Sequence, residues 1–361
     1  MTDEQQAEAV TIAGVMSPAP RDIWQSLADA DEHALPFQTP AWTDALCASG
    51  DWMDASRLYT FSDGRQAVLP LVRRRRRAVD VAATEASMPP QWGSGGAVCA
   101  ASLSEADLRA VLEDLRAAPA LRVLLRPSPL RAAMWAAAMP RGTTTVQHVA
   151  HILDLDGGFA LVAGQRFHRS TRRYIRIAER SGLTVESATG AALVPQYHEL
   201  YLRWVERRAR ERHVPRGIAH HRAEPRRRLE LIAAHMGPSC RIWHARHDGR
   251  PAAALMLVVH GAHAVYLRGC SDLALTRRTK ANDLLQRLAI EEACAAGCRY
   301  YHMGESGGVA SLMSFKERFG ARPFSFRELR LERLPVTSLE ACVGRTMAAV
   351  EARLLAAGAR R

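Results

Sequence analysis

One short pattern occurs twice along the chain, and it limits the fold more than any other feature of the sequence. The pattern is a strand-like segment, an Asp-Gly turn and a second, apolar segment. Its first turn is Asp63-Gly64, and its second, 185 residues later, is Asp248-Gly249. An Asp-Gly pair between two such segments is a strong signal for a β-hairpin. The sequence therefore predicts two hairpins, one in each half of the chain.

The elements that follow each hairpin keep nearly the same spacing. A helix with a capping-box-like start is predicted from Ser104, and its counterpart runs from Asn282 to Gly297. The strands predicted next, residues 121–126 and 298–303, begin 177 residues apart. Three elements in one order predict a duplicated α/β unit. One continuous sheet, or unrelated folds in the two halves, would contradict two such units.

Length and composition agree with two globular domains. The chain has 361 residues, of which 48% are hydrophobic and 24% charged, as is usual for globular proteins. The longest strongly apolar run, residues 252–259, is too short to cross a bilayer, and the first ten residues do not resemble a signal peptide. Seven thinly spread cysteines are typical of reduced thiols. We therefore expect a cytoplasmic protein with no membrane span.

The positive charge is confined to two stretches. The net charge is +12, residues 166–180 hold six arginines and one acid, and residues 203–228 hold ten arginines and three acids. The first stretch lies in an amphipathic helix predicted from Gly164 to Ser181. A solvated helix face is one explanation, and a polyanionic or phosphate-bearing partner is the other. The arginines on which the second explanation depends are Arg169, Arg172, Arg173 and Arg176.

Two motifs that carry chemistry in other proteins are set aside. The run Gly304 to Gly308 has the G-x-S-x-G pattern of a hydrolase nucleophile, but no histidine follows Ser306 to complete a triad. This run is better interpreted as a Gly-rich loop after a strand. Cys294, Cys298 and His302 are spaced by four, but a helix end at Gly297 would separate the cysteines, so we expect no metal site.

Two cationic segments remain as candidates. Arg277, Arg278, Lys280 and Asn282 precede or open a predicted helix, whose N-terminus could seat a phosphate; an exposed basic loop is an equally good reading. Lys316 follows the Gly-rich loop and is one of only two lysines in the chain. A compact ammonium can stabilise a developing oxyanion, although the alternative is a surface lysine on a helix.

Together these segments resemble the acetyltransferase-like domain of the Gcn5-related N-acyltransferase (GNAT) superfamily. The resemblance is strongest to the Fem-type peptidoglycan aminoacyltransferases and the cellulose-biosynthesis-type acetyltransferases. It extends over residues 164–331, through the basic helix, the Asp248-Gly249 turn, residues 284–297 and the Phe315-Lys316-x-x-Phe319-Gly320 motif. Residues 37–42 and 89–93 resemble the first, divergent half of these proteins.

The resemblance implies a mixed α/β fold of two tandem GNAT-like domains. Residues 1–155 would form the divergent first domain. Residues 156–335 would form the acyltransferase domain, with a helical, Arg-rich insertion at about 195–236. A closing helix is expected at residues 336–361.

The resemblance also implies an enzyme that forms amide bonds. An aminoacyl or acyl group would move from a tRNA ester or a thioester to the amine of a small molecule or peptide. Phe315 and Lys316 match the pair that lies by the reacting carbonyl in Fem-type enzymes, and Glu305 is our third catalytic candidate. Tyr300 and Tyr301 are our candidates for binding the acceptor. We expect no bound cofactor.

The donor depends on the segment before the predicted helix. Acyl-CoA-dependent members of the superfamily commonly carry an R-x-x-G-x-G/A loop, and here Lys280 and Asn282 stand where glycines would be. This departure favours aminoacyl-tRNA over acetyl-CoA as co-substrate, with tRNA on the arginine stripe and the donor end near residues 277–282. The alternatives are an acyl-CoA-dependent N-acetyltransferase and a non-catalytic nucleic-acid-binding scaffold.

Overall fold

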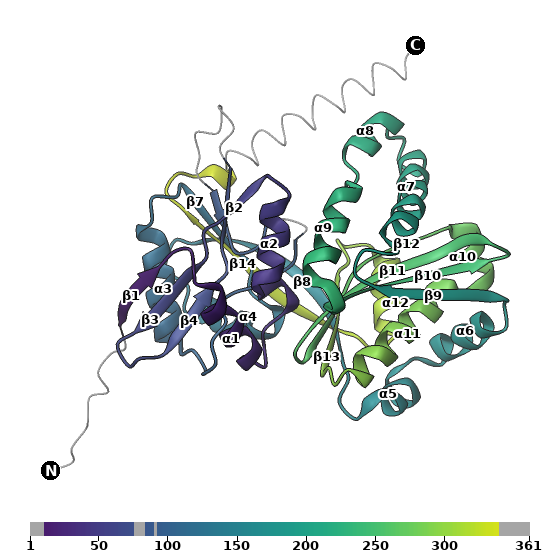
Figure 1. Cartoon of the computed structure of the whole chain (residues 1–361), viewed down its shortest axis with the longest axis horizontal. Helices are drawn as coiled ribbons and strands as arrows, with labels where there is room; N and C mark the ends of the chain where they lie inside the picture. The colour runs from purple at the N-terminus through teal and green to yellow at the C-terminus, as the bar shows by residue number, and fades with distance from the viewer. Residues whose placement is uncertain (1–10, 76–83, 90–91, 339–361) are drawn as a thin grey trace.

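The computed structural model describes residues 11–75, 84–89 and 92–338, and Figure 1 shows them in two lobes. The closing helix expected at 336–361 lies, from residue 339, outside the described residues. The first half contains β1 (Ile12–Met16), α1 (Arg21–Ala30), α2 (Pro40–Ala48), β2 (Trp52–Asp54), β3 (Arg57–Phe61), β4 (Gln66–Leu69), β5 (Val72–Arg74), β6 (Thr84–Ala86), α3 (Glu105–Ala117), β7 (Arg122–Leu125), α4 (Ala132–Ala137) and β8 (Thr144–Asp154).

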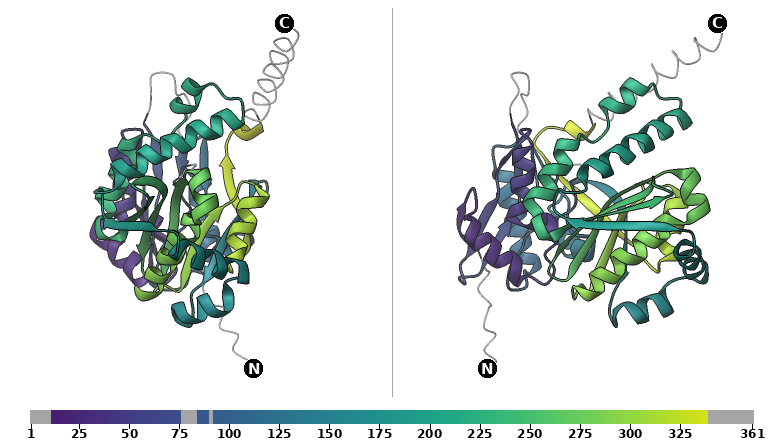
Figure 2. Two further views of the ribbon diagram at one scale, coloured as in Figure 1. Left: turned by 90° about the vertical axis from the view of Figure 1, so that its right-hand side faces the viewer. Right: turned by 45° about the vertical axis from the view of Figure 1, so that its right-hand side comes forward.

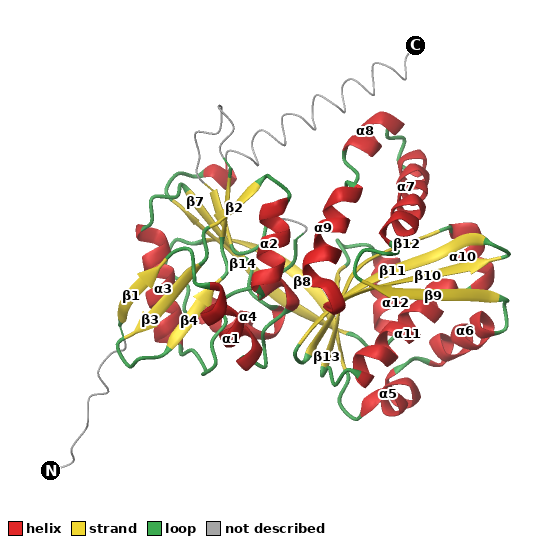
Figure 3. Ribbon diagram, viewed as in Figure 1, coloured by secondary structure: helices red, strands yellow, loops and turns green. Residues whose placement is uncertain are grey.

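The second half is built largely from the longer elements. It contains α5 (Gly158–Leu161), a π-helical turn (Val162–Arg166), α6 (Arg169–Glu179), β9 (Leu183–Thr189), α7 (Val194–Glu211), α8 (Arg216–His221), α9 (Arg226–Met236), β10 (Cys240–His247), β11 (Arg250–His260), β12 (His263–Ser271), α10 (Leu273–Thr279), α11 (Ala281–Ala295), β13 (Tyr300–Glu305), α12 (Ala310–Arg318) and β14 (Arg322–Glu332). Figure 3 shows strands running through both lobes, with helices on their faces.

The same order of elements occurs in both halves. In the first half, leaving aside the additional short strands β2, β5 and β6, β1 is followed by α1 and α2, the β3–β4 hairpin, an extended segment at residues 95–98, α3, β7, α4 and β8. In the second half β9 is followed by α7 to α9, the β10–β11 hairpin, β12, α10 and α11, β13, α12 and β14. The tandem α/β organisation expected from the sequence is confirmed.

Local sequence explains the repeated elements. Asp248 and Gly249 have φ angles of 49° and 72°, the left-handed geometry that a tight hairpin turn requires at both central residues. The α3 helix begins with a capping box in which Ser104 and Asp107 bond each other's main-chain N–H groups. Leu108, Val111 and Leu112 on one face of α3 are then buried in the core of the first half.

The final strand of each half pairs with the other half. β8 lies antiparallel to β13, with Leu153 opposite Tyr301, while β14 lies antiparallel to β7, with Leu329 opposite Leu125. The two exchanged strands also pair with each other along most of their length, so one eleven-stranded sheet runs from β2 to β9. The expectation that the halves would not share a continuous sheet is therefore wrong, because exchange of the last strands joins two units of the same topology.

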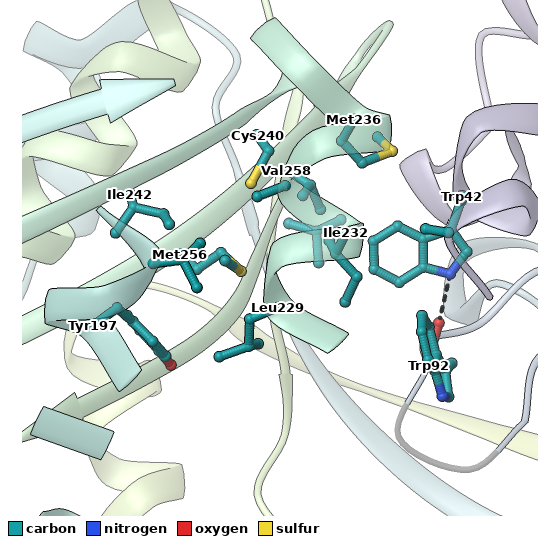
Figure 4. Close-up of a cluster of buried hydrophobic side chains, with 14 of the residues drawn as sticks. Trp42, Trp92, Tyr197, Leu229, Ile232, Met236, Cys240, Ile242, Met256 and Val258 are labelled. Carbon is teal, nitrogen blue, oxygen red and sulfur yellow. Dashed lines mark hydrogen bonds between the residues drawn. The ribbon is translucent and has the colours of Figure 1, made fainter. Parts of the chain in front are cut away.

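The predicted Arg-rich insertion consists of α7, α8 and α9, which stand above the sheet of the second half (Figure 2). Its last helix, α9, packs against α2 of the first half. Figure 4 shows this contact: Trp42 and Trp92 from the first half meet Ile232 and Met236 of α9 in one buried cluster. The Trp42 Nε1–H donates to the Trp92 carbonyl oxygen at 3.1 Å. The two halves thus share a hydrophobic core as well as a sheet.

Candidate active site

A cavity opens where two parallel strands of the second half cease to pair. β12 and β13 are bonded from His263 opposite Tyr300 to Val265 opposite His302, and beyond these residues both strands line a cavity of about 420 Å³. We call it the main cavity. Helices α11 and α12 form its other walls, and α7 lies at its rim. A volume of this size is typical of small-molecule sites.

Lys316 on α12 lies at the wall of the main cavity and is only 2% exposed. Its Nζ donates hydrogen bonds of 2.8 Å to the carbonyl oxygens of Gly304 and Glu305, at the end of β13. Burial lowers the pKa of Lys316 to about 8, because the charged ammonium loses solvation. The structure thus excludes the reading of Lys316 as a solvated surface lysine.

The rest of the Phe-Lys motif fixes α12 in place. Phe315 is half-buried and lines the main cavity, whereas Phe319 is fully buried, with its ring centroid 5.1 Å from that of Phe167. Gly320 has a φ of 84°, and a Cβ atom there would lie 2.6 Å from the Arg166 carbonyl oxygen. Only glycine permits this close approach, which anchors the end of α12 against the π-helical turn.

Glu305, at the end of β13, is shared between two cavities. It lines the main cavity and also a smaller one of about 170 Å³, the side cavity, which lies between the two halves. Its carboxylate pairs with Arg126 and accepts a 2.9 Å hydrogen bond from His148 Nδ1, both residues of the first half. Burial and the nearby Arg126 charge lower the pKa of His148.

Of the four residues predicted to bind the donor, only Asn282 lines the main cavity. Asn282 lies in the first turn of helix α11, and its Nδ2 donates a hydrogen bond to Ser271 Oγ at 3.2 Å. Arg277 and Arg278 are exposed in the last turn of α10, a short helix where the sequence suggested a loop. Lys280 caps α11 in a left-handed conformation, and its Nζ bonds the Arg277 carbonyl oxygen at 2.7 Å.

The arginine stripe predicted for polyanion binding lies on α6, which begins at Arg169 after the π-helical turn rather than at Gly164. All four predicted arginines are exposed. Arg172 turns back and bonds the carbonyl oxygens of Gly164 and Phe167 at 2.8 and 2.6 Å. In the part of the chain that the structure describes, no carboxylate pairs with Arg169, Arg173 or Arg176.

The two tyrosines predicted to bind the acceptor line neither cavity. Tyr301 is fully buried under α11, and its hydroxyl donates to Gln286 Oε1 at 2.7 Å. Tyr300 lies at the start of β13, opposite the end that opens into the cavities, and stacks on His263 at 5.3 Å. The structure thus places neither tyrosine at a cavity, because side chains alternate between the faces of a strand and only the far end of β13 reaches the cavities.

A buried histidine pair beside the side cavity was missed. His263 Nε2 lies 3.0 Å from the carbonyl oxygen of Glu32, which can only accept, so this nitrogen carries the proton. Burial lowers the pKa of His263 to about 4 and that of His302 to about 3, so both rings are neutral. His263 Nδ1 then accepts from His302 Nε2 at 2.9 Å, which leaves Nδ1 of His302 as an acceptor. His302 lines the side cavity.

Two kinds of feature are not found in the part of the chain that the structure describes. Within residues 11–75, 84–89 and 92–338, no three His, Cys, Asp or Glu side chains converge as a metal site would require. Over the same residues, every helix is too short or too polar to serve as a membrane span.

Comparisons with known proteins agree with this geometry. Residues 165–316 match the acetyltransferase (GNAT) domain family. The structure is similar to that of FemX, with 13% sequence identity and a TM-score of 0.69, and the match covers 90% of this chain and 99% of FemX. L-PGS from Bacillus licheniformis, at 14% identity and a TM-score of 0.53, covers 89% and 95%. No curated protein matches by sequence. Residues 165–316 are therefore similar to a GNAT acetyltransferase domain, and the whole chain is similar in fold to FemX.

Proposed function

We propose that this protein is an N-acyltransferase that moves an aminoacyl group from an aminoacyl-tRNA to the amine of a small molecule or peptide. The observation that carries the proposal is the buried ammonium of Lys316 at the wall of the main cavity. A charged group so deprived of water is costly to maintain, and perturbed groups of this kind are concentrated at functional sites.

In the proposed reaction the amine nitrogen attacks the ester carbonyl carbon, and negative charge develops on the carbonyl oxygen. An ammonium has three N–H donors, and Gly304 and Glu305 occupy two of them on Lys316. The third is free for the carbonyl oxygen, where it stabilises the transition state more than the ground state. The C–O bond then breaks, and the ribose oxygen takes up the proton that the amine has released, so that the products are the amide and the free ribose hydroxyl.

The attacking amine must lose a proton during this step, and we assign its acceptance to Glu305. The carboxylate lies where the main and side cavities meet, so an amine in the side cavity would reach it beside the donor carbonyl. Arg126 and His148 hold the carboxylate in position from the first half of the chain. The acceptor-binding role is thereby transferred from Tyr300 and Tyr301 to the side cavity.

The arginine stripe on α6 supports a tRNA donor. Three cations lie over the ring of Tyr174: Arg173 of α6 at 5.4 Å, Lys280 at the start of α11 at 5.0 Å and Arg318 of α12 at 5.1 Å. The positive charge of the stripe therefore continues from α6 to α11 and α12. A phosphate backbone bound along α6 would thus end near the N-terminus of α11, where Asn282 opens into the main cavity.

Acetyl-CoA remains the second candidate donor. The N-terminus of α11 carries the positive end of the helix dipole beside the main cavity, a position suited to a pyrophosphate. The same feature would serve the terminal phosphate of tRNA, so it does not separate the two donors.

The test is a donor assay followed by mass spectrometry. The protein would be incubated with charged tRNA pools or with acetyl-CoA, each with a set of amines, and amide products identified. We expect product only with charged tRNA, and far less of it with the Lys316→Met variant. Product with acetyl-CoA alone would overturn the tRNA donor. Salt-sensitive tRNA binding with no product from either donor would favour a non-catalytic scaffold.

A further inference from the structure

Helix α7 carries a row of stacked aromatic rings that ends at the main cavity. The ring centroids of Tyr197 and Tyr201 are 6.5 Å apart and those of Tyr201 and Trp204 are 5.9 Å apart, with interplanar angles of 14° and 22°. Spacings of four and three residues place all three on one helix face. Tyr197 is fully buried, whereas Trp204 is half-buried and lines the main cavity. The row therefore presents an indole at the cavity rim.

Arg208 continues this row one turn further along α7. Its guanidinium carbon lies 5.0 Å from the centroid of the Trp204 ring, and it also lines the main cavity. Burial lowers the pKa of Arg208, and the neighbouring Arg212 and Arg207 lower it further. No carboxylate of the described residues forms an ion pair with Arg208, and Glu211, which offsets its charge in part, is already paired with Arg207.

Other arginines of the same helix differ in this respect. Arg203 pairs with Glu199 at 2.5 Å, and Arg207 pairs with Glu211 at 2.6 Å, each within one turn of α7. Arg208 is thus the arginine of α7 that lines the main cavity and forms no ion pair with a described carboxylate, so it is available to an external anion. A guanidinium binds phosphate through paired N–H donors.

We propose that Trp204 and Arg208 form a nucleotide-binding subsite at the rim of the main cavity. The indole stacks on the nucleobase and the guanidinium binds the phosphate. The inference rests on the proposed function in one respect: the nucleotide is the part of the donor that carries the transferred group.

An adenosine nucleotide occurs in both candidate donors, at the end of aminoacyl-tRNA and in coenzyme A. In an aminoacyl nucleotide the ester is attached directly to the ribose, next to the base. In coenzyme A the long pantetheine arm separates the thioester from the base. Because Trp204 and Lys316 line one cavity of about 420 Å³, the geometry favours the short donor.

The experiment measures binding by calorimetry with four probes: adenosine, AMP, a 3′-aminoacylamino-3′-deoxyadenosine 5′-phosphate whose amide resists transfer, and acetyl-CoA. For Trp204→Leu we expect AMP affinity to fall about 5- to 150-fold, the range for loss of one base–aromatic stack, whereas Trp204→Phe keeps most of it. Arg208→Gln should weaken AMP about 10- to 150-fold but leave adenosine unchanged. The aminoacyl analogue should bind wild type more tightly than acetyl-CoA does.

Arg210→Gln is the matched control, because Arg210 is exposed on the same helix and does not line the cavity. Equal AMP binding by wild type and Trp204→Leu, or equal losses for Arg208→Gln and Arg210→Gln, would overturn the subsite. Unchanged thermal midpoints identify variants that fold. Tighter binding of acetyl-CoA would reassign the subsite to coenzyme A. These readouts do not depend on amide formation, so a failure of the proposed transfer is seen separately.

Discussion

The two halves share an order of elements, yet among the described residues the second half is open between its central strands and the first half is not. In the second half the pairing of β12 with β13 ends at Val265 and His302. In the first half the corresponding segments stay bonded: Gly95 N–H donates to the Arg126 carbonyl oxygen at 2.7 Å, and Ser128 N–H donates to the Gly95 carbonyl oxygen at 2.6 Å. Trp135 of α4 is buried against this junction.

This difference shows how one topology serves two tasks. The first half closes the opening with hydrogen bonds and an indole, and α4, the counterpart of α12, carries no charged residue. The second half leaves the opening free and places Lys316 in it. The closed half still contributes to the candidate site, since Arg126 and His148 reach across to Glu305.

The largest effect on the transfer rate is expected for a substitution in the open half, compared with one in the closed half. We expect Lys316→Met to lower single-turnover aminoacyl transfer about 10²–10³-fold, because an oxyanion donor is lost. Lys316→Arg should recover little of the transfer rate, since the planar guanidinium of arginine cannot occupy the position of the compact lysine ammonium. Trp135→Phe, in the closed half, should transfer at nearly the wild-type rate. Wild-type transfer by Lys316→Met would remove the contrast.

The substitution that lowers activity, Lys316→Met, should raise the stability of the fold. The folded pKa of Lys316, about 8, is below its ordinary value of 10.5, so the unfolded state binds this proton more tightly. The cost is therefore fully present below pH 8 and disappears as the pH rises toward 10.5. At pH 7 we expect Lys316→Met to raise the free energy of unfolding by up to about 3 kcal/mol in urea titrations. A less stable variant would contradict this view.

Salt dependence tests the arginine stripe against the helical insertion. Replacing Arg169, Arg173 and Arg176 with glutamine should reduce the slope of log affinity for tRNA against log salt by about 2–3. The matched control replaces three arginines that pair with a glutamate on their own helix: Arg203, Arg207 and Arg226. The control should change the slope less. Equal slopes for the two triple variants in filter binding would show that the unpaired arginines contribute no more to tRNA binding than the paired ones.

The smallest expected effect is the pH profile. With an acceptor whose amine is already neutral at pH 7, transfer should fall about tenfold per pH unit above pH 8, as Lys316 loses its proton. Lys280→Gln should show the same profile, because Lys280 does not line the main cavity. The measurement is the single-turnover rate between pH 6 and 10. A rate that stays level to pH 10 would argue that Lys316 acts without its charge.

Sequence alone predicts the features that depend on neighbouring residues. The Asp248-Gly249 turn and the Ser104 cap lie where local rules place them. Exchange of β8 and β14 could not be predicted, because both strands would complete either half equally well by pattern alone. The shared sheet depends on pairings such as Leu329 with Leu125, which are far apart in the chain.

The candidate site divides in the same way. Lys316 stood out as an isolated lysine after a Gly-rich loop, and the structure buries it at the cavity. Tyr301 was chosen for its position on a strand, but the face it occupies is set by α11. The sequence does not single out Trp204, because the other residues of the cavity wall come from β12 and α12, which are distant along the chain.

The exchanged strands also set the order in which the protein can be completed as it leaves the ribosome. β14 lies next to the central strand of the sheet, although it is among the last described segments to be synthesised. Leu329 and Leu331 of this strand belong to the core of the first half, together with Val123 and Leu125. The amino-terminal lobe must therefore wait, with part of its interior uncovered, until nearly the whole chain has emerged.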